Sequence, residues 1–342
     1  MEPKDFPANL SVGLDRTIHT LKTSRRFIRG ITKEDVEDEI TLIDALNRSV
    51  KKATHFVLPD HGVVFNDGLK GLQGVPLRLP FPHITVSYRD FYDDGSIRNM
   101  CALAYESEYD PETGGDGSQT YIQKGDRVIR VHVFENNKRL SEDMRGVEKI
   151  RKFAWYYEPT MITVPSEWEQ SRSKMISIGD VRGDPNDESA LPLSYIVLGS
   201  FMVKITQNRL GLDQEAAAIE MMEYASSHMA NAVGAVASLC EALACSNVGY
   251  ETLPPSKRLK LKKTDGVQIP RFDSYTLTIN SASKSKRYEN DGEETGPKRN
   301  GPREHLRRGH IRTLQSGEKV WVNACIVGNP EKGRIQKDYA VL

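Results

Sequence analysis

Apolar residues recur at helical spacing in two parts of the chain. In the first part they follow a three-and-four spacing at Val36, Ile40, Ile43, Leu46 and Val50. This spacing predicts an amphipathic helix that ends near Lys52. The preceding segment 32–35, Thr-Lys-Glu-Asp, resembles a capping box, and Ile31 is placed to act as a hydrophobic staple.

A second helix is predicted to begin after Asp213, which can cap it, and to run to about Ala244. Its apolar residues are Ile219, Met222, Met229, Val233, Val236, Cys240 and Leu243. Because alanine and methionine dominate, we expect this helix to lie close against a sheet. A methionine-rich stripe at this spacing is typical of a core; a dimer interface is the alternative.

Between and after these helices the hydrophobic period changes to that of strands. Strands are expected at 83–88, 100–105, 128–134, 161–164, 195–205 and 273–279. Short connections between them favour an antiparallel sheet over repeated βαβ units. The predicted fold class is therefore α+β: an antiparallel sheet with packed helices, and a small basic C-terminal β-subdomain.

Charge divides the chain into two parts. The whole chain has 47 Lys and Arg against 47 Asp and Glu, but residues 253–342 have 19 against 10. We predict an acidic α+β body at 1–252 and a basic β-subdomain at 253–342. This asymmetry is typical of a protein whose basic part binds a polyanion such as nucleic acid; the alternative is that the basic part docks on the acidic body.

Within the basic part, residues 281–304 have almost no apolar content, which predicts a flexible loop. The last strands, expected at 320–322, 324–327 and 339–342, should join 275–279 in a small sheet. The loop would then deliver the segment 305–312, His-Leu-Arg-Arg-Gly-His-Ile-Arg, to the edge of that sheet.

The segment 305–312 has a composition typical of a functional site, because arginine binds phosphate and histidine can accept and donate protons at neutral pH. The first interpretation is nucleic-acid contact through Arg307, Arg308 and Arg312. The second is metal-independent cleavage of RNA, with His305 and His310 as acid and base and Arg308 stabilising the charged intermediate. The third is a structural β-edge with solvated polar side chains.

Two further features fit nucleic-acid binding. A basic run adds Lys257, Arg258, Lys260, Lys262 and Lys263, although such runs are often plain solvated charge. Trp321 is a possible stacking platform for a base, with a core position as its alternative. No P-loop, G-x-G-x-x-G or G-x-S-x-G motif is present, and we predict neither a cofactor nor a metal.

The compartment follows from the cysteines and the apolar runs. The four cysteines form no C-x-x-C pair, which favours reduced thiols in a cytosolic protein. The N-terminus lacks the basic and apolar regions of a secretory signal. The longest apolar run, 191–205, is too short to span a bilayer, so we expect a cytoplasmic protein with no membrane partner.

The C-terminal pattern, His305-x-Arg307-Arg308-Gly309-His310-x-Arg312 followed by Gly-x-Lys-x-Trp-Val at 317–322, resembles the ending of a family of uncharacterised tailed-bacteriophage and prophage proteins. This copy has Ile311 where the family has an aromatic residue. The resemblance implies a phage protein in the bacterial host cytoplasm and carries no catalytic role. We therefore predict a phage accessory protein that binds nucleic acid, RNA or single-stranded DNA being favoured. The alternatives are the ribonuclease and a host-takeover protein that binds a host enzyme.

Overall fold

The computed structural model describes thirteen stretches of the chain. They are residues 2–23, 30–64, 78–91, 95–108, 124–136, 155–165, 195–198, 200–256, 269–279, 303–307, 310–322, 325–327 and 329–335. Among these residues, no helix combines the length and the apolar character that crossing a bilayer requires.

An eight-stranded sheet forms the centre of the protein. Its strands are β1 (Thr54–Val57), β2 (His83–Phe91), β3 (Ile97–Glu108), β4 (Arg127–Asn136), β5 (Tyr156–Pro165), β6 (Tyr195–Leu198), β7 (Val248–Leu253) and β8 (Ser274–Ile279). Their order is β6-β5-β4-β3-β2-β1-β8-β7. Strand β1 runs parallel to both of its neighbours, and every other neighbouring pair is antiparallel. The predicted α+β class with a largely antiparallel sheet is confirmed.

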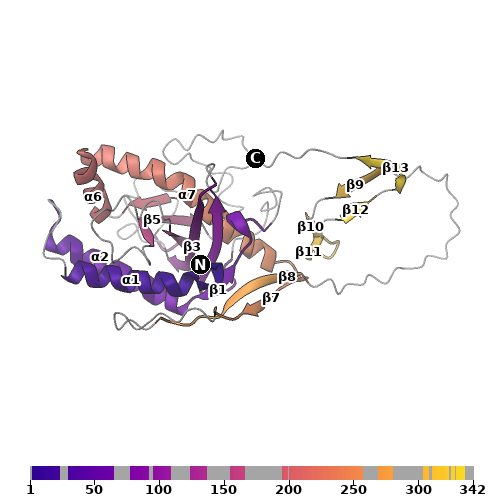
Figure 1. Cartoon of the computed structure of the whole chain (residues 1–342), viewed down its shortest axis with the longest axis horizontal. Coiled ribbons are helices and arrows are strands. Elements are labelled where there is room, and N and C mark those ends of the chain that lie inside the picture. The colour runs from indigo at the N-terminus through magenta and orange to yellow at the C-terminus, as the bar shows by residue number, and fades with distance from the viewer. Residues whose placement is uncertain are drawn as a thin grey trace.

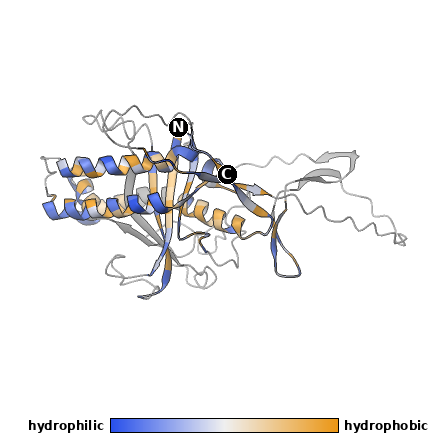
Figure 2. Ribbon diagram, turned by 90° about the horizontal axis from the view of Figure 1, so that it is seen from below, coloured by the Kyte–Doolittle hydropathy of each residue, from blue (hydrophilic) through white to orange (hydrophobic). Residues whose placement is uncertain are grey.

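Helices cover both faces of this sheet (Figure 1). One face packs against α1 (Phe6–Thr23) and α2 (Lys33–Lys52), and the other packs against α7 (Gln214–Leu243). Because side chains alternate along a strand, Leu103 of β3 joins the core under α1 and α2, whereas Ala102 joins the core under α7. Figure 2 shows hydrophilic and hydrophobic residues on the two long helices of one face, as expected of amphipathic helices, whereas the helix on the other face is largely hydrophobic.

The start of α2 is as predicted. The Thr32 hydroxyl accepts a hydrogen bond from the Asp35 backbone N–H, and the Asp35 carboxylate accepts one from the Thr32 N–H, which completes the capping box. Ile31 and Val36 share a small buried cluster, as a hydrophobic staple does. Local sequence therefore determines where this helix begins.

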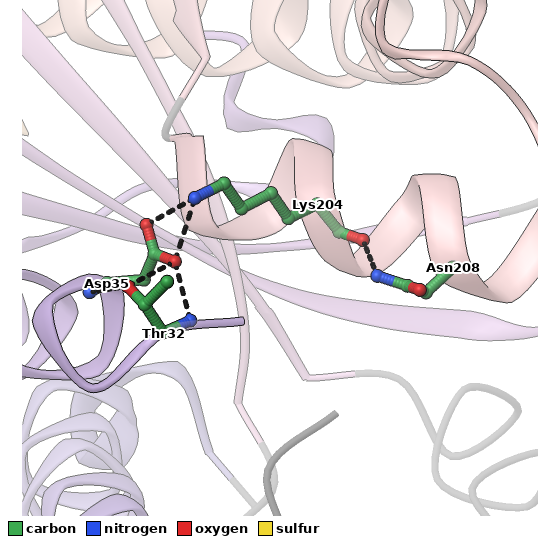
Figure 3. A network of polar contacts seen from close by, with 4 residues as sticks. All are labelled: Thr32, Asp35, Lys204 and Asn208. Atoms are coloured by element: carbon green, nitrogen blue, oxygen red, sulfur yellow. Dashed lines mark hydrogen bonds and ion pairs between the residues drawn. The ribbon is translucent and has the colours of Figure 1, made fainter. Parts of the chain in front are cut away.

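Part of the prediction for 195–205 is wrong. Only β6 is a strand, and α6 (Ser200–Leu210) follows it as a helix. Phe201 of α6 packs with Ile31 and Val36, and the Lys204 ammonium donates to both carboxylate oxygens of Asp35 at 2.7 and 2.8 Å. Figure 3 shows this link between α2 and α6. A short apolar run does not distinguish a strand from a buried helix, and here the contacts with α2 favour the helix.

The long helix α7 begins at its predicted cap, where the Asp213 carboxylate accepts from the Ala216 N–H at 2.8 Å. Val233, Val236 and Cys240 lie in the core against the sheet, as predicted. Ile219, in contrast, is 46% exposed, although Ala217 two residues earlier is fully buried. Helix α1 was not predicted.

The C-terminal strands form two small sheets of their own. They are β9 (Arg303–Arg307), β10 (His310–Thr313), β11 (Lys319–Val322), β12 (Cys325–Val327) and β13 (Asn329–Ile335). Strands β10 and β11 form a hairpin, here called the C-terminal hairpin, and the second sheet has the order β12-β9-β13.

The expectation that 275–279 joins these C-terminal strands is wrong. Strand β8 lies inside the large sheet, where it pairs in parallel with β1 and antiparallel with β7. A division at residue 252 therefore separates β8 from its sheet neighbours. Residues 339–342 and most of the expected loop 281–304 lie outside the described residues.

Candidate nucleic-acid interface

The C-terminal strands β9, β10 and β11 carry several of the predicted site residues. His305 and Arg307 lie on β9, where they are opposite Val327 and Cys325 of β12. His310 and Arg312 lie on β10, and Trp321 lies on β11. The two histidines therefore belong to different sheets, and strand pairing does not place them opposite each other.

The other predicted residues lie outside the described part of the chain. They are Arg308 and the basic run Lys257, Arg258, Lys260, Lys262 and Lys263. Their proposed contacts with nucleic acid stay predictions.

The C-terminal hairpin presents one of the predicted arginines to solvent. Arg312 is exposed and lies opposite Val320, while Ile311 lies opposite the half-buried Trp321. The turn is closed by the Leu314 N–H, which donates to the Glu318 carbonyl at 2.7 Å. Trp321 is thus partly covered, and Arg312 is the residue of this hairpin that is best placed to meet a phosphate.

One asparagine joins this hairpin to the body of the protein. The Asn247 side-chain amide donates to the Trp321 carbonyl at 2.7 Å, and the Trp321 N–H donates back to Asn247 Oδ1 at 2.7 Å. The Ser246 N–H donates to the Lys319 carbonyl at 3.0 Å. Asn247 follows the end of α7 and precedes β7, so the hairpin is held at the point where the helix passes into the sheet. We call these three hydrogen bonds the Asn247 clamp.

A buried carboxyl lies next to this clamp. Glu241 of α7 is 2% exposed, and burial raises its pKa to about 7, against a smaller lowering effect of Lys319. Burial and the charge of Glu241 also raise the pKa of the neighbouring Cys245 thiol to about 11. This thiol is therefore protonated at neutral pH and is a poor nucleophile.

An exposed aromatic ring lies three residues beyond Asn247. Tyr250 of β7 is 46% exposed, yet its ring is supported by others. Ring centroids lie 5.2 Å away for Tyr275, 5.8 Å for Phe56 and 6.1 Å for Phe81. A ring that is fixed on one side and open on the other can stack with a nucleobase.

A second polar site, which sequence reasoning missed, lies at the turn after β1. This turn, η2 (Asp60–Gly62), carries His61, whose Nδ1 is 2.7 Å from Oδ1 of Asp90 on β2. The His61 side chain is 54% exposed, whereas that of Asp90 is buried. With Nδ1 donating to the carboxylate, Nε2 is the ring nitrogen left with a lone pair for proton transfer.

The buried side of this histidine–aspartate pair is well supported. Asp90 Oδ1 also accepts from the Phe91 N–H at 3.0 Å, and Oδ2 lies 3.7 Å from the guanidinium of the buried Arg98. The Phe91 ring packs against the His61 ring with centroids 5.2 Å apart. The imidazole is therefore held in one orientation by a charge behind it and a ring beside it.

The backbone at this turn is strained. His61 has φ 63°, a left-handed conformation that is costly for a residue with a side chain and that concentrates at functional sites. Gly62, with φ 68°, presses against α7, since an added Cβ would lie 2.6 Å from the Ala235 Cβ. The sequence signal that could have found this site is the turn Pro-Asp-His-Gly at 59–62 directly after a strand.

Topology brings the two sites to the same edge of the sheet. Strands β1, β2 and β8 run parallel, so their C-terminal ends share one edge. His61 follows the end of β1, Asp90 lies near the end of β2, and the last residue of β8 pairs with Val248, next to Asn247. Three strand spacings separate β2 from β7, roughly 14 Å. We call the edge at which β1, β2 and β8 end the carboxyl edge.

In comparisons with known proteins, no family model, no curated protein and no solved structure matches this chain. Over the described residues, no group of three or more His, Cys, Asp or Glu side chains comes together in a way that could hold a metal ion. The features of the chain that bear on function are therefore the geometry of the carboxyl edge and the positive charge of residues 253–342.

Proposed function

We propose that this protein binds single-stranded nucleic acid across the carboxyl edge of its sheet. The observation that carries the proposal is the Asn247 clamp, which places a hairpin with an exposed arginine beside a strand with an exposed, supported tyrosine. Arg312 would contact phosphate, and Tyr250 would stack with an unpaired base. Duplex nucleic acid offers no free base face to Tyr250, which favours single strands.

The charge distribution supports the same proposal. The excess of nine positive charges in residues 253–342 would attract a polyanion, while the acidic remainder would repel it. Arg307, Arg308 and the basic run at 257–263 would add phosphate contacts. That the protein is a bacteriophage accessory protein of the host cytoplasm stays a prediction from the C-terminal signature.

Fluorescence anisotropy tests this proposal. Labelled single-stranded RNA, single-stranded DNA and duplex DNA of one sequence are titrated over a salt series. Arg312→Ala should reduce the salt slope by about 0.7, as expected for the loss of one phosphate contact to a single strand. Tyr250→Ala should weaken binding about 5- to 150-fold and leave the slope unchanged, because stacking releases no counterions.

Arg48→Ala supplies the matched control, because Arg48 is exposed on α2, where it pairs with Asp44. If none of the three ligands binds, or if Arg312→Ala has the same slope as Arg48→Ala, the proposal is wrong. Capture of a host protein that survives nuclease treatment would then favour the host-takeover alternative.

A further inference from the structure

We infer that His61 is a general base that cleaves RNA held at the carboxyl edge, with Asp90 as its positioning residue. The inference rests on the proposed nucleic-acid binding and adds an activity to it. Its basis is the 2.7 Å contact between the exposed His61 ring and the buried Asp90 carboxylate. An imidazole whose Nδ1 is held by a buried carboxylate presents Nε2 for proton transfer, as in the histidine–aspartate part of a catalytic triad.

Four properties distinguish this pair from an ordinary surface contact. The carboxylate is buried and is backed by Arg98, so that it is a fixed acceptor. The imidazole is open to solvent on its other side. The left-handed backbone at His61 aims the ring, and Gly62 locks the turn against α7. Such local strain is typical of residues whose position matters for function.

The substrate class follows from what the site supplies and what it does not. The pair supplies proton transfer, and over the described residues the side-chain contacts of His61 are with Asp90 and Phe91, neither of which is a hydroxyl or thiol nucleophile. RNA brings its own nucleophile, the 2′-hydroxyl. The exposed Phe91 ring beside His61 is placed to stack with the base of the reacting nucleotide. A strand bound at Tyr250 and Arg312 would reach His61 along the same edge.

The reaction balances without any further reagent. His61 Nε2 takes the proton of the 2′-hydroxyl, and the 2′-oxygen attacks the adjacent phosphorus. The bond from phosphorus to the 5′-oxygen breaks, and that oxygen takes a proton from water. The hydroxide formed is neutralised by the proton on His61. The products are a 2′,3′-cyclic phosphate and a 5′-hydroxyl end.

The test uses the full chain with end-labelled single-stranded RNA and DNA of one sequence, and binding is measured by anisotropy on the same samples. We expect the wild type to cleave RNA and to leave DNA intact. His61→Gly, in which glycine accepts the left-handed backbone, should cleave at least 100-fold more slowly with unchanged binding, and added imidazole should restore part of the rate. Asp90→Asn should lower kcat and leave KM unchanged. His19→Ala, an exposed histidine on α1, is the control and should behave as the wild type.

Two outcomes would overturn the inference while the proposed function stands. One is RNA that is bound by the wild type but not cleaved. The other is cleavage that persists in His61→Gly. In that case, loss of cleavage in a double variant, His305→Ala with His310→Ala, would assign the activity to the C-terminal histidines. Failure to bind RNA at all would instead show that the proposed function is wrong, and the inference would fall with it.

Discussion

Substitution of Asn247 should release the C-terminal hairpin from the body of the protein. The Asn247 side chain makes two hydrogen bonds of 2.7 Å to the backbone of Trp321. Each such bond contributes about 0.5–1.5 kcal/mol, so Asn247→Ala should weaken docking of the hairpin by about 1–3 kcal/mol. The Ser246 N–H and hydroxyl still donate to the Lys319 carbonyl, but both bonds hold the hairpin at this one oxygen only.

Amide hydrogen exchange measured by mass spectrometry can detect this release. A loss of about 1–3 kcal/mol corresponds to an increase of roughly 5- to 150-fold in the exchange rates of hairpin amides that open through undocking. We expect the increase in peptides that cover 310–322, while β2 to β4 keep their protection. The same variant should also bind single strands more weakly, because the hairpin that carries Arg312 would no longer be held next to the start of the strand that carries Tyr250.

Asn208→Ala is the matched control for this experiment. The Asn208 side chain donates to the Lys204 carbonyl within α6, far from the hairpin in the sequence (Figure 3). Its substitution should leave exchange in 310–322 unchanged. If Asn247→Ala also leaves these amides protected as in the wild type, the Asn247 side chain does not hold the hairpin on the body of the protein.

Two further predictions concern the body of the protein. Glu39 of α2 is 5% exposed, and burial raises its pKa from 4.5 to about 7, so the folded state binds an extra proton between these pH values. The stability that this extra proton adds is present in full below pH 4.5 and is lost as the pH rises through about 7. The loss in the free energy of unfolding is about 3 kcal/mol. Glu39→Gln should remove this pH dependence from urea unfolding curves. Equal pH dependence in the variant and the wild type would contradict the assignment. Gly62→Ala should destabilise the fold by about 2–4 kcal/mol, because it adds backbone strain and a clash with Ala235. Gly95→Ala is the control: Gly95 has φ 76° and open space around it, so this substitution should cost only about 1 kcal/mol. Similar unfolding midpoints for the two variants would show that the turn does not press on α7.

The parts of the fold that the sequence predicted are those with local signals. Thr32 and Asp35 cap α2 and lie only three residues apart, so a short window contains everything that fixes the start of the helix. Asp213 does the same for α7. The predicted strands at 83–88 and 128–134 are confirmed, and each of these segments pairs on both sides within the sheet.

The parts that were missed depend on contacts between distant residues. Whether 200–205 becomes a strand or a helix depends on Asp35 and Ile31, about 170 positions away. The partners of β8 are β1 and β7, and no local pattern distinguishes them from the C-terminal strands. His61 and Asp90 are 29 positions apart. The segment Pro-Asp-His-Gly at 59–62 indicates a turn, but nothing near it in the sequence indicates that Asp90 is the partner of His61.

The parallel pairing of β1 with β8 has a consequence for how the protein is made. Thr54–Val57 emerge from the ribosome early, yet their partner Ser274–Ile279 follows more than 200 residues later. Lys4 and Asp5 likewise bond to Ser274 and Ser256. Contacts of such long sequence separation form slowly, because a long loop must close first. The edge that carries the proposed site should therefore assemble last, and a nascent chain cannot engage a ligand there before its body is almost complete.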